Sequence, residues 1–313
     1  MIRYLVSRLA GMIVVMFIVA TLVFLITRLA PGDPAAVMLG EQASAADIAK
    51  LRASYGLDRP LPVQFGYWLQ QLVHGNLGQS IFLQRPVTQA LAERTEPTFF
   101  LTLFSLGIAM LIGVPCGIAA AVWRGRAIDQ VFSGFAMLGA SIPSFWLGLL
   151  LMELFAVALG WFPVAGYGEP GVALSVRLHH LVLPAIVLGV VNSALILRFT
   201  RASMLDVLGE DHIRTARAKG MSETRVVMLH ALRNALIPVT TVVGLTFALL
   251  IGGAIVTETV FGLPGVGNLV VSAVLRRDYP VIQGALLVIA ALYVLINLAI
   301  DLLYLVIDPR VKY

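Results

Sequence analysis

Six uncharged, apolar stretches of this chain are each long enough to cross the hydrocarbon core of a lipid bilayer. A transmembrane helix needs about 20 apolar residues, and about 17 is the lower limit. Because backbone amides find no water in lipid, such stretches must form helices. The six stretches run over residues 9–27, 98–123, 131–152, 181–197, 235–257 and 279–300. The sequence therefore predicts an all-α integral membrane protein with six transmembrane helices.

The composition argues against a soluble protein. Hydrophobic residues make up 59% of the 313 positions and charged residues only 12%, whereas soluble domains average about 45–50% and about 25%. A single soluble domain of this size cannot bury so much apolar surface. The one cysteine, Cys116, excludes an intramolecular disulfide. The net charge of +5 does not indicate nucleic-acid binding, because in a membrane protein the placement of Lys and Arg carries the information.

The distribution of Lys and Arg predicts that both termini lie in the cytoplasm. With the N-terminus inside, the inner segments contain 13 basic residues, seven of them between the fourth and fifth spans. The short outer loops contain only Arg177, Arg276 and Arg277. Cytoplasmic loops carry the excess of basic residues in membrane proteins. The first span has 19 uncharged residues, which is too long for a cleaved signal peptide, so we expect it to be retained.

The spans divide the chain into three regions. These are an N-terminal span (residues 1–30), an outer cap segment between spans 1 and 2 (31–97) and a five-helix core (98–313) that includes a cytoplasmic loop (198–236). In the cap segment, Pro31-Gly32-Asp33-Pro34 and Arg59-Pro60-Leu61-Pro62 indicate turns. Short amphipathic helices are expected at residues 45–55 and 63–73. Three aromatic residues of the second helix are expected at the membrane interface rather than against a substrate: Phe65, Tyr67 and Trp68.

The loop between the fourth and fifth spans is polar, yet it has the pattern of two helices. Helix formers run from Ala202 towards Lys219, and Gly220 occupies the position after a basic helix end, where a left-handed cap is common. Ser222 can cap a second helix that continues to Pro238. From this spacing alone, a hairpin for a partner protein and a solvated loop that only enforces the topology are equally good interpretations.

The sequence of this loop resembles the coupling loop of ABC importer permeases and, more narrowly, that of the dipeptide, oligopeptide and nickel permease family. The corresponding residues are Arg214-Thr215-Ala216-Arg217-Ala218-Lys219-Gly220-Met221-Ser222, followed by His230-Ala231-Leu232-Arg233-Asn234-Ala235-Leu236-Ile237-Pro238. Further family-like segments occur at residues 30–34, 56–62, 141–148, 276–280 and 308–310, so the resemblance covers nearly the whole chain. The chain departs from the family pattern at His212, where tyrosine is common, and at Leu263, where tryptophan is common.

This resemblance implies a permease subunit of an ABC importer, a multi-pass protein of a bacterial-type inner (cytoplasmic) membrane. It implies a translocation path for short peptides or a related small solute, and it does not distinguish dipeptides, oligopeptides, glutathione, nickel chelates and opines. The implied partners are a second homologous permease, two ATPase subunits and an extracytoplasmic solute-binding protein. ATP and Mg²⁺ are expected on the ATPase subunits, because this chain lacks the phosphate-binding sequence G-x-x-x-x-G-K-[ST]. No cofactor, metal or catalytic site is expected in this chain.

In this interpretation the nine residues from Arg214 to Ser222 contact an ATPase. Small residues there let the partner surface approach the backbone closely, namely Ala216, Ala218 and Gly220. Charged residues orient the partner, namely Arg217, Lys219 and Arg225. Three glycines further along indicate a proline–glycine turn rather than a nucleotide site: Gly262, Gly265 and Gly267.

The alternative functions are a membrane enzyme and a secondary transporter or channel. The reactive motifs H-E-x-x-H and G-x-S-x-G are absent. A secondary transporter couples ions through intramembrane carboxylates, and the candidates are Glu153, Glu258 and Asp301. All three lie at span ends, where we expect them to face lipid headgroups. Polar residues within the later spans are candidates for lining a path, although helix–helix hydrogen bonds are their commoner role; they are Ser141, Asn192, Ser193, Thr246 and Asn297.

Overall fold

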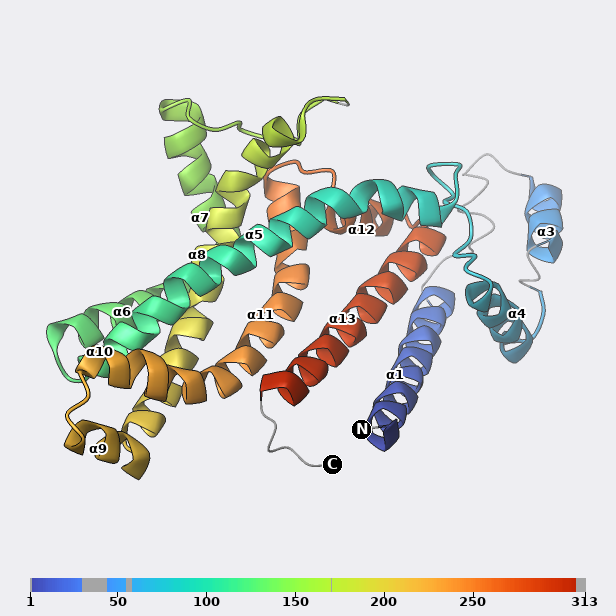
Figure 1. Ribbon diagram of the computed structural model, residues 1–313. Helices are drawn as coiled ribbons and strands as arrows, with labels where there is room; N and C mark the ends of the chain where they lie inside the picture. Colours follow the sequence, from blue (N-terminus) through green and yellow to red (C-terminus); the bar gives the residue numbers. More distant parts are fainter. Residues whose placement is uncertain (1, 30–43, 55–57, 170, 308–313) are drawn as a thin grey trace. The chain divides into compact units, whose positions relative to one another are not determined.

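The computed structural model describes residues 2–29, 44–54, 58–169 and 171–307, which are mostly helical (Figure 1). Within this part of the chain, extended pairing is limited to an isolated β-bridge between Gln79 and Pro86. The turn predicted at residues 31–34, the start of the 56–62 segment and the terminal 308–310 segment lie outside the described residues. The prediction of an all-α fold is confirmed.

The helical elements follow one another with short connections. In chain order they are α1 (Ile2–Leu29), α3 (Ala45–Ser54), α4 (Leu61–Val73), α5 (Val87–Val122), α6 (Ala127–Ser141), α7 (Ser144–Leu151), η1 (Met152–Ala158), α8 (Leu174–Leu208), α9 (Asp211–Ala218), α10 (Glu223–Arg225), η2 (Val226–Ala231), α11 (Leu232–Val260), α12 (Val266–Leu275) and α13 (Tyr279–Ile307). The elements η1 and η2 are π-helices.

Among the described residues, five helices are long and apolar enough to cross a membrane: α1, α5, α8, the run that ends with α11, and α13. A sixth crossing results if α6 and the α7–η1 helix count as one span, although the chain bends by 100° between them. The bend follows from Pro143, which has no N–H and keeps Ile142 out of helical geometry, at a ψ of 122°. The predicted third span, residues 131–152, is therefore broken within its length.

The chain forms two compact units. The first contains residues 1–95 and 269–295, and the second contains residues 96–268 and 296–312. The helices α5, α12 and α13 each contribute residues to both units. Each unit has packing and polar contacts of its own.

In the first unit, α4 packs aromatic side chains against α1. The ring of Phe24 lies 5.2 Å from that of Phe65 and 5.5 Å from that of Trp68, measured between centroids. Tyr67 is exposed instead, with the guanidinium of Arg59 5.1 Å from its ring centroid. Two of the three aromatic residues predicted as interface anchors therefore hold a pair of helices together.

Asp278 fixes the turn before α5 in the same unit. Its carboxylate accepts a hydrogen bond from the Ser80 hydroxyl at 2.5 Å and from the N–H groups of Ile81 and Phe82, both at 3.2 Å. Asp278 is 3% exposed, so these donors replace the water that its carboxylate has lost. This contact gives a structural role to one of the family-like segments, residues 276–280.

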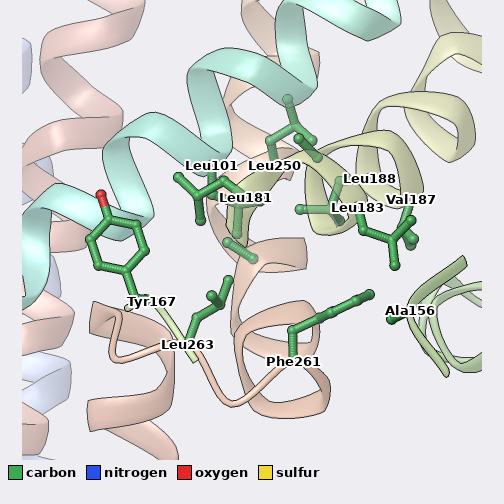
Figure 2. Packing of buried hydrophobic residues seen from close by; sticks show 12 residues of the cluster. Leu101, Ala156, Tyr167, Leu181, Leu183, Val187, Leu188, Leu250, Phe261 and Leu263 are labelled. Atoms are coloured by element: carbon green, nitrogen blue, oxygen red, sulfur yellow. The ribbon is translucent and has the colours of Figure 1, made fainter. Parts of the chain in front are cut away.

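In the second unit, one hydrophobic core gathers around α8. The side chains in Figure 2 come from α5, η1, α8, α11 and the two turns next to α8 and α11. The labelled members are Leu101, Ala156, Tyr167, Leu181, Leu183, Val187, Leu188, Leu250, Phe261 and Leu263. This core fixes the half of α8 that precedes Asn192 between α5 and α11.

Glycines let α5 and α8 approach each other closely. A Cβ atom at Gly113 would lie 2.8 Å from the Cβ of Ile196, and one at Gly117 would lie 2.6 Å from the Cβ of Thr200. A Cβ atom at Gly189 of α8 would likewise lie too close to a side chain of α5. Small residues at such crossings let helix backbones pack within a membrane.

Replacing Gly113 by alanine is expected to destabilise the protein, although alanine is the better helix former. Overpacking against Ile196 costs about 1–3 kcal/mol, which exceeds the gain of about 1 kcal/mol in helix propensity. Gly107→Ala on the same helix is the matched control, because nothing lies within 4 Å of a Cβ there. Thermal unfolding in detergent should show a lower Tm for Gly113→Ala and not for the control. An unchanged Tm for both variants would contradict the close crossing.

Candidate functional site

The segment between α8 and α11 forms a helical hairpin, residues 211–231, next to the end of α8 (Figure 1). It consists of α9, a turn at residues 219–222, α10 and the π-helical η2, which continues into α11. Gly220 has a φ of +78°, and the N–H of Met221 donates to the Ala216 carbonyl at 3.3 Å. This is a left-handed helix cap, so the predicted conformation of Gly220 is confirmed.

One face of the hairpin is buried against the C-terminal ends of α5 and α8. We call the apolar residues at this contact the anchor cluster. It consists of Ile213, Ala216, Val226, Val227 and Ala231 of the hairpin, Ala235 of α11, Met204 and Val207 of α8, and Ala121 of α5. The Ile213 and Val226 side chains are fully buried. The hairpin is therefore packed on two spans and is continuous with a third.

The opposite face is exposed and contains seven of the nine residues predicted to contact an ATPase. These are Arg214, Thr215, Arg217, Ala218, Lys219, Gly220 and Ser222. Met221 is half-buried, and Ala216 is buried in the anchor cluster. The small side chain of Ala216 thus serves packing rather than the approach of a partner. Ala218 and Gly220 do leave an open surface, since nothing lies within 4 Å of a Cβ placed at Gly220.

Arg217 closes the hairpin across its turn. Its Nε donates to Oε1 of Glu223 at 2.7 Å, and its Nη2 donates to Oε2 at 3.3 Å. Both side chains are partly exposed, and surface ion pairs of this kind contribute about 0–1 kcal/mol. The charge that was expected to orient a partner is therefore shared with Glu223. Lys219 and Arg225 are the other exposed cations near the turn.

The five polar residues predicted to line a path do not share one environment. Ser141 and Asn297 are exposed, Asn192 is half-buried, and Ser193 and Thr246 are buried. In four of them the side chain donates to a carbonyl three or four residues earlier in its own helix, at 2.7–2.8 Å: Ser141, Asn192, Ser193 and Thr246. Their polar groups are thus satisfied locally, and a shared path through them stays a prediction.

Glu258 is fully buried, so the prediction that it faces lipid headgroups was wrong. Its carboxylate accepts a hydrogen bond from the Thr98 hydroxyl of α5 at 2.5 Å and from the N–H of Asn268 in α12 at 2.9 Å. The chain reverses after α11 and brings the first turn of α12 onto this carboxylate, where unpaired N–H groups favour a negative charge. We call these groups the Glu258 clamp. Glu153 is exposed and Asp301 is half-buried.

Two glycines make room for the buried carboxylate. A Cβ at Gly265 would lie 2.2 Å from Cδ of Glu258, and one at Gly267 would lie 2.5 Å from Cα of Ile255. The predicted proline–glycine turn is present, but sequence reasoning did not connect its glycines with Glu258. Gly265 follows Glu258 by seven positions, and this spacing was the only signal in the sequence that could have connected them.

A second polar contact ties the first turn of α8 and the loop before it to α5. Glu96 accepts a hydrogen bond from Nη1 of Arg177 at 2.5 Å and from the Tyr167 hydroxyl at 3.0 Å. Burial, together with the neighbouring Glu96 carboxylate, raises the pKa of Tyr167 to about 12. The Tyr167 hydroxyl therefore keeps its proton at physiological pH and remains a donor.

Ile213→Ala is expected to loosen the hairpin without unfolding the spans. Removing the buried part of an isoleucine side chain costs about 2–5 kcal/mol, so the open population of residues 211–222 should rise at least tenfold. Hydrogen–deuterium exchange should show this as faster exchange in the hairpin, with α8 and α13 unchanged. Thr215→Ala, on the exposed face of the same helix, is the control. Equal exchange in both variants would mean that the anchor cluster does not hold the hairpin.

Two family models match the chain. The model of the binding-protein-dependent transport system inner membrane component matches residues 113–313. The model of the N-terminal part of this membrane component matches residues 1–102.

Curated relatives match the chain over its whole length. The glutathione transport system permease protein GsiC of Salmonella typhi is 47% identical over 313 residues, which is 100% of each chain. The same protein of Pectobacterium atrosepticum is 48% identical with the same coverage. A probable peptide ABC transporter permease protein of Sinorhizobium fredii is 46% identical over 99% of each chain.

A solved structure of the MetNI methionine ABC transporter in an inward-facing conformation has the same fold. The match has a TM-score of 0.60 at 20% identity and covers 70% of this chain and 97% of that chain. The family match decides against a secondary transporter or channel. The chain belongs to the family of binding-protein-dependent transport system inner membrane components and is the permease component of an ABC importer.

Proposed function

We propose that this permease imports glutathione or short peptides, and that separate ATPase subunits drive it by acting on the hairpin. The solute is supported by relatives at 46–48% identity that are permeases of glutathione or peptide systems. The site is supported by the anchored hairpin, which is the observation that carries the proposal. One of its faces is fixed to α5 and α8, and the other is exposed.

The proposed partners are a second homologous permease, two ATPase subunits that hold ATP and Mg²⁺, and an extracytoplasmic solute-binding protein. The hairpin and both termini face the cytoplasm in this arrangement, since the basic residues concentrate there. The helices α3 and α4 belong to a cap on the outer face in this arrangement. Exposed apolar side chains on the spans, such as Ile13, Leu111 and Met137, meet lipid or the second permease.

Closing of the ATPase subunits would push on the exposed face of the hairpin. The push reaches three spans at once, because the hairpin packs on α5 and α8 and continues into α11. Ala218 and Gly220 let the ATPase surface come close to the backbone, and Lys219 and Arg225 orient it by charge. The permease then switches between inward-open and outward-open packings of its helices without covalent chemistry.

The energy source tests this proposal in proteoliposomes that contain the complete transporter and its binding protein. Uptake of labelled glutathione or alanylalanine should need ATP and Mg²⁺ on the hairpin side and should survive collapse of the proton gradient by an ionophore. Uptake that needs the gradient and no ATP would contradict the proposal. Failure to import either solute, with ATP hydrolysis still stimulated by the binding protein, would contradict only the solute.

Gly220→Trp is expected to abolish ATP-driven uptake while the permease still inserts. The strain of a side chain at positive φ is about 1 kcal/mol, as for Gly220→Ala, but tryptophan also holds the ATPase away from the hairpin. Gly75→Trp is the matched control, because Gly75 has a φ of +75° and an equally open Cβ position outside the hairpin. Co-purification of the ATPase should fail for Gly220→Trp alone. Wild-type uptake by that variant would mean that the hairpin is only a connector.

A further inference from the structure

The run from Glu223 to Val260 is helical over its 38 residues, and it contains the π-helix η2 and Pro238. Its length along the helix is about 57 Å at about 1.5 Å per residue. In Figure 1 it is the orange helix that leads from α10 through α11 to the turn before α12. Both of its ends are held by contacts within the second unit.

At the hairpin end, the run is held by apolar packing. Val226, Val227 and Ala231 of η2 lie in the anchor cluster, together with Met204 of α8. The exposed face that we assign to the ATPase is part of the same hairpin. A displacement of the hairpin is therefore also a displacement of the first turns of this helix.

At the far end, the last turn of α11 carries Glu258, which joins three helices. Its two carboxylate oxygens accept from different elements: Oε1 from the Thr98 hydroxyl of α5 and Oε2 from the Asn268 N–H of α12. The Thr98 oxygen in turn accepts from the N–H of Val266, at 2.9 Å. A buried carboxylate without such donors is strongly destabilising, so the three helix segments are held to one geometry.

We propose that Glu258 is a positioning residue that transmits movement of the hairpin, along α11, to α5 and to the start of α12. This inference rests on the proposed function, because the movement is supplied by ATPase subunits at the hairpin. It assigns to this buried carboxylate a role in coupling ATP hydrolysis to the movement of solute. Coupling, rather than assembly, is therefore the property that its loss changes.

Glu258→Gln tests the proposal with a side chain of the same shape. Glutamine keeps one acceptor oxygen for the Asn268 N–H and removes the negative charge, and its NH₂ group can contact the Thr98 hydroxyl only by donating to it, so the direction of that clamp bond is reversed. The readout is the number of solute molecules imported per ATP hydrolysed, with labelled glutathione, or alanylalanine if the wild type imports that instead. This ratio should fall at least about fivefold, while ATP hydrolysis and co-purification of the ATPase stay near the wild-type level.

A second pair of variants tests the clamp from the α5 side, where no carboxylate is lost. Thr98→Val removes the hydroxyl and should lower the ratio, whereas Thr98→Ser keeps the hydroxyl and should restore it. The double variant Thr98→Val, Glu258→Gln should lower the ratio no further than the more severe of the two single variants does. This is expected because the two residues are partners in one contact. Thr259→Val changes an exposed hydroxyl that bonds within α11 and should leave the ratio unchanged.

The outcomes separate this inference from the proposed function. A wild-type transporter without ATP-driven uptake would overturn both. Normal wild-type uptake with unchanged ratios for Glu258→Gln and Thr98→Val would overturn the inference alone. The inference alone would also be overturned if uptake, ATP hydrolysis and the amount of assembled complex fell in parallel in these variants. The clamp would then serve only the stability of the permease.

Discussion

The anchor cluster is the contact on which the rest of the mechanism depends. Helix α9 has eight residues, and a polar helix of that length is not stable in water by itself. Its position comes from burial of apolar side chains such as Ile213 and Val226, each of which contributes roughly 1.5–3 kcal/mol when fully buried. Because the same side chains touch α5 and α8, the packing that stabilises the hairpin also connects it mechanically to the spans.

The two ends of the helix that contains α11 are held by opposite kinds of interaction. The hairpin end is apolar and nondirectional, and it tolerates small adjustments of side-chain packing. The Glu258 end is a buried carboxylate whose donors come from fixed backbone and hydroxyl positions, and Gly265 and Gly267 leave it no spare volume. A helix that is held at both ends in this way links the position of the hairpin to that of the Glu258 clamp.

Much of the fold could be predicted because few structures satisfy backbone amides in lipid. The break at Pro143 was not evident, since prolines also occur within intact spans, as Pro184 does in α8. The cap at Gly220 was predictable from local sequence, because its φ depends on neighbouring residues. The burial of Ala216 and Glu258 was not, because it depends on which distant helices reach these side chains.

The central claim is that the hairpin and the end of α8 move as one body. Spin labels at Ala202 and Thr215, both exposed, would measure this directly in the complete transporter, with Cys116 replaced. The distance distribution between the two labels should stay the same when a non-hydrolysable ATP analogue closes the ATPase subunits, while distances from Thr215 to the ATPase change. A shift or broadening between Ala202 and Thr215 on nucleotide binding would show that the hairpin swings on its turns, and the anchor cluster would then not transmit the motion.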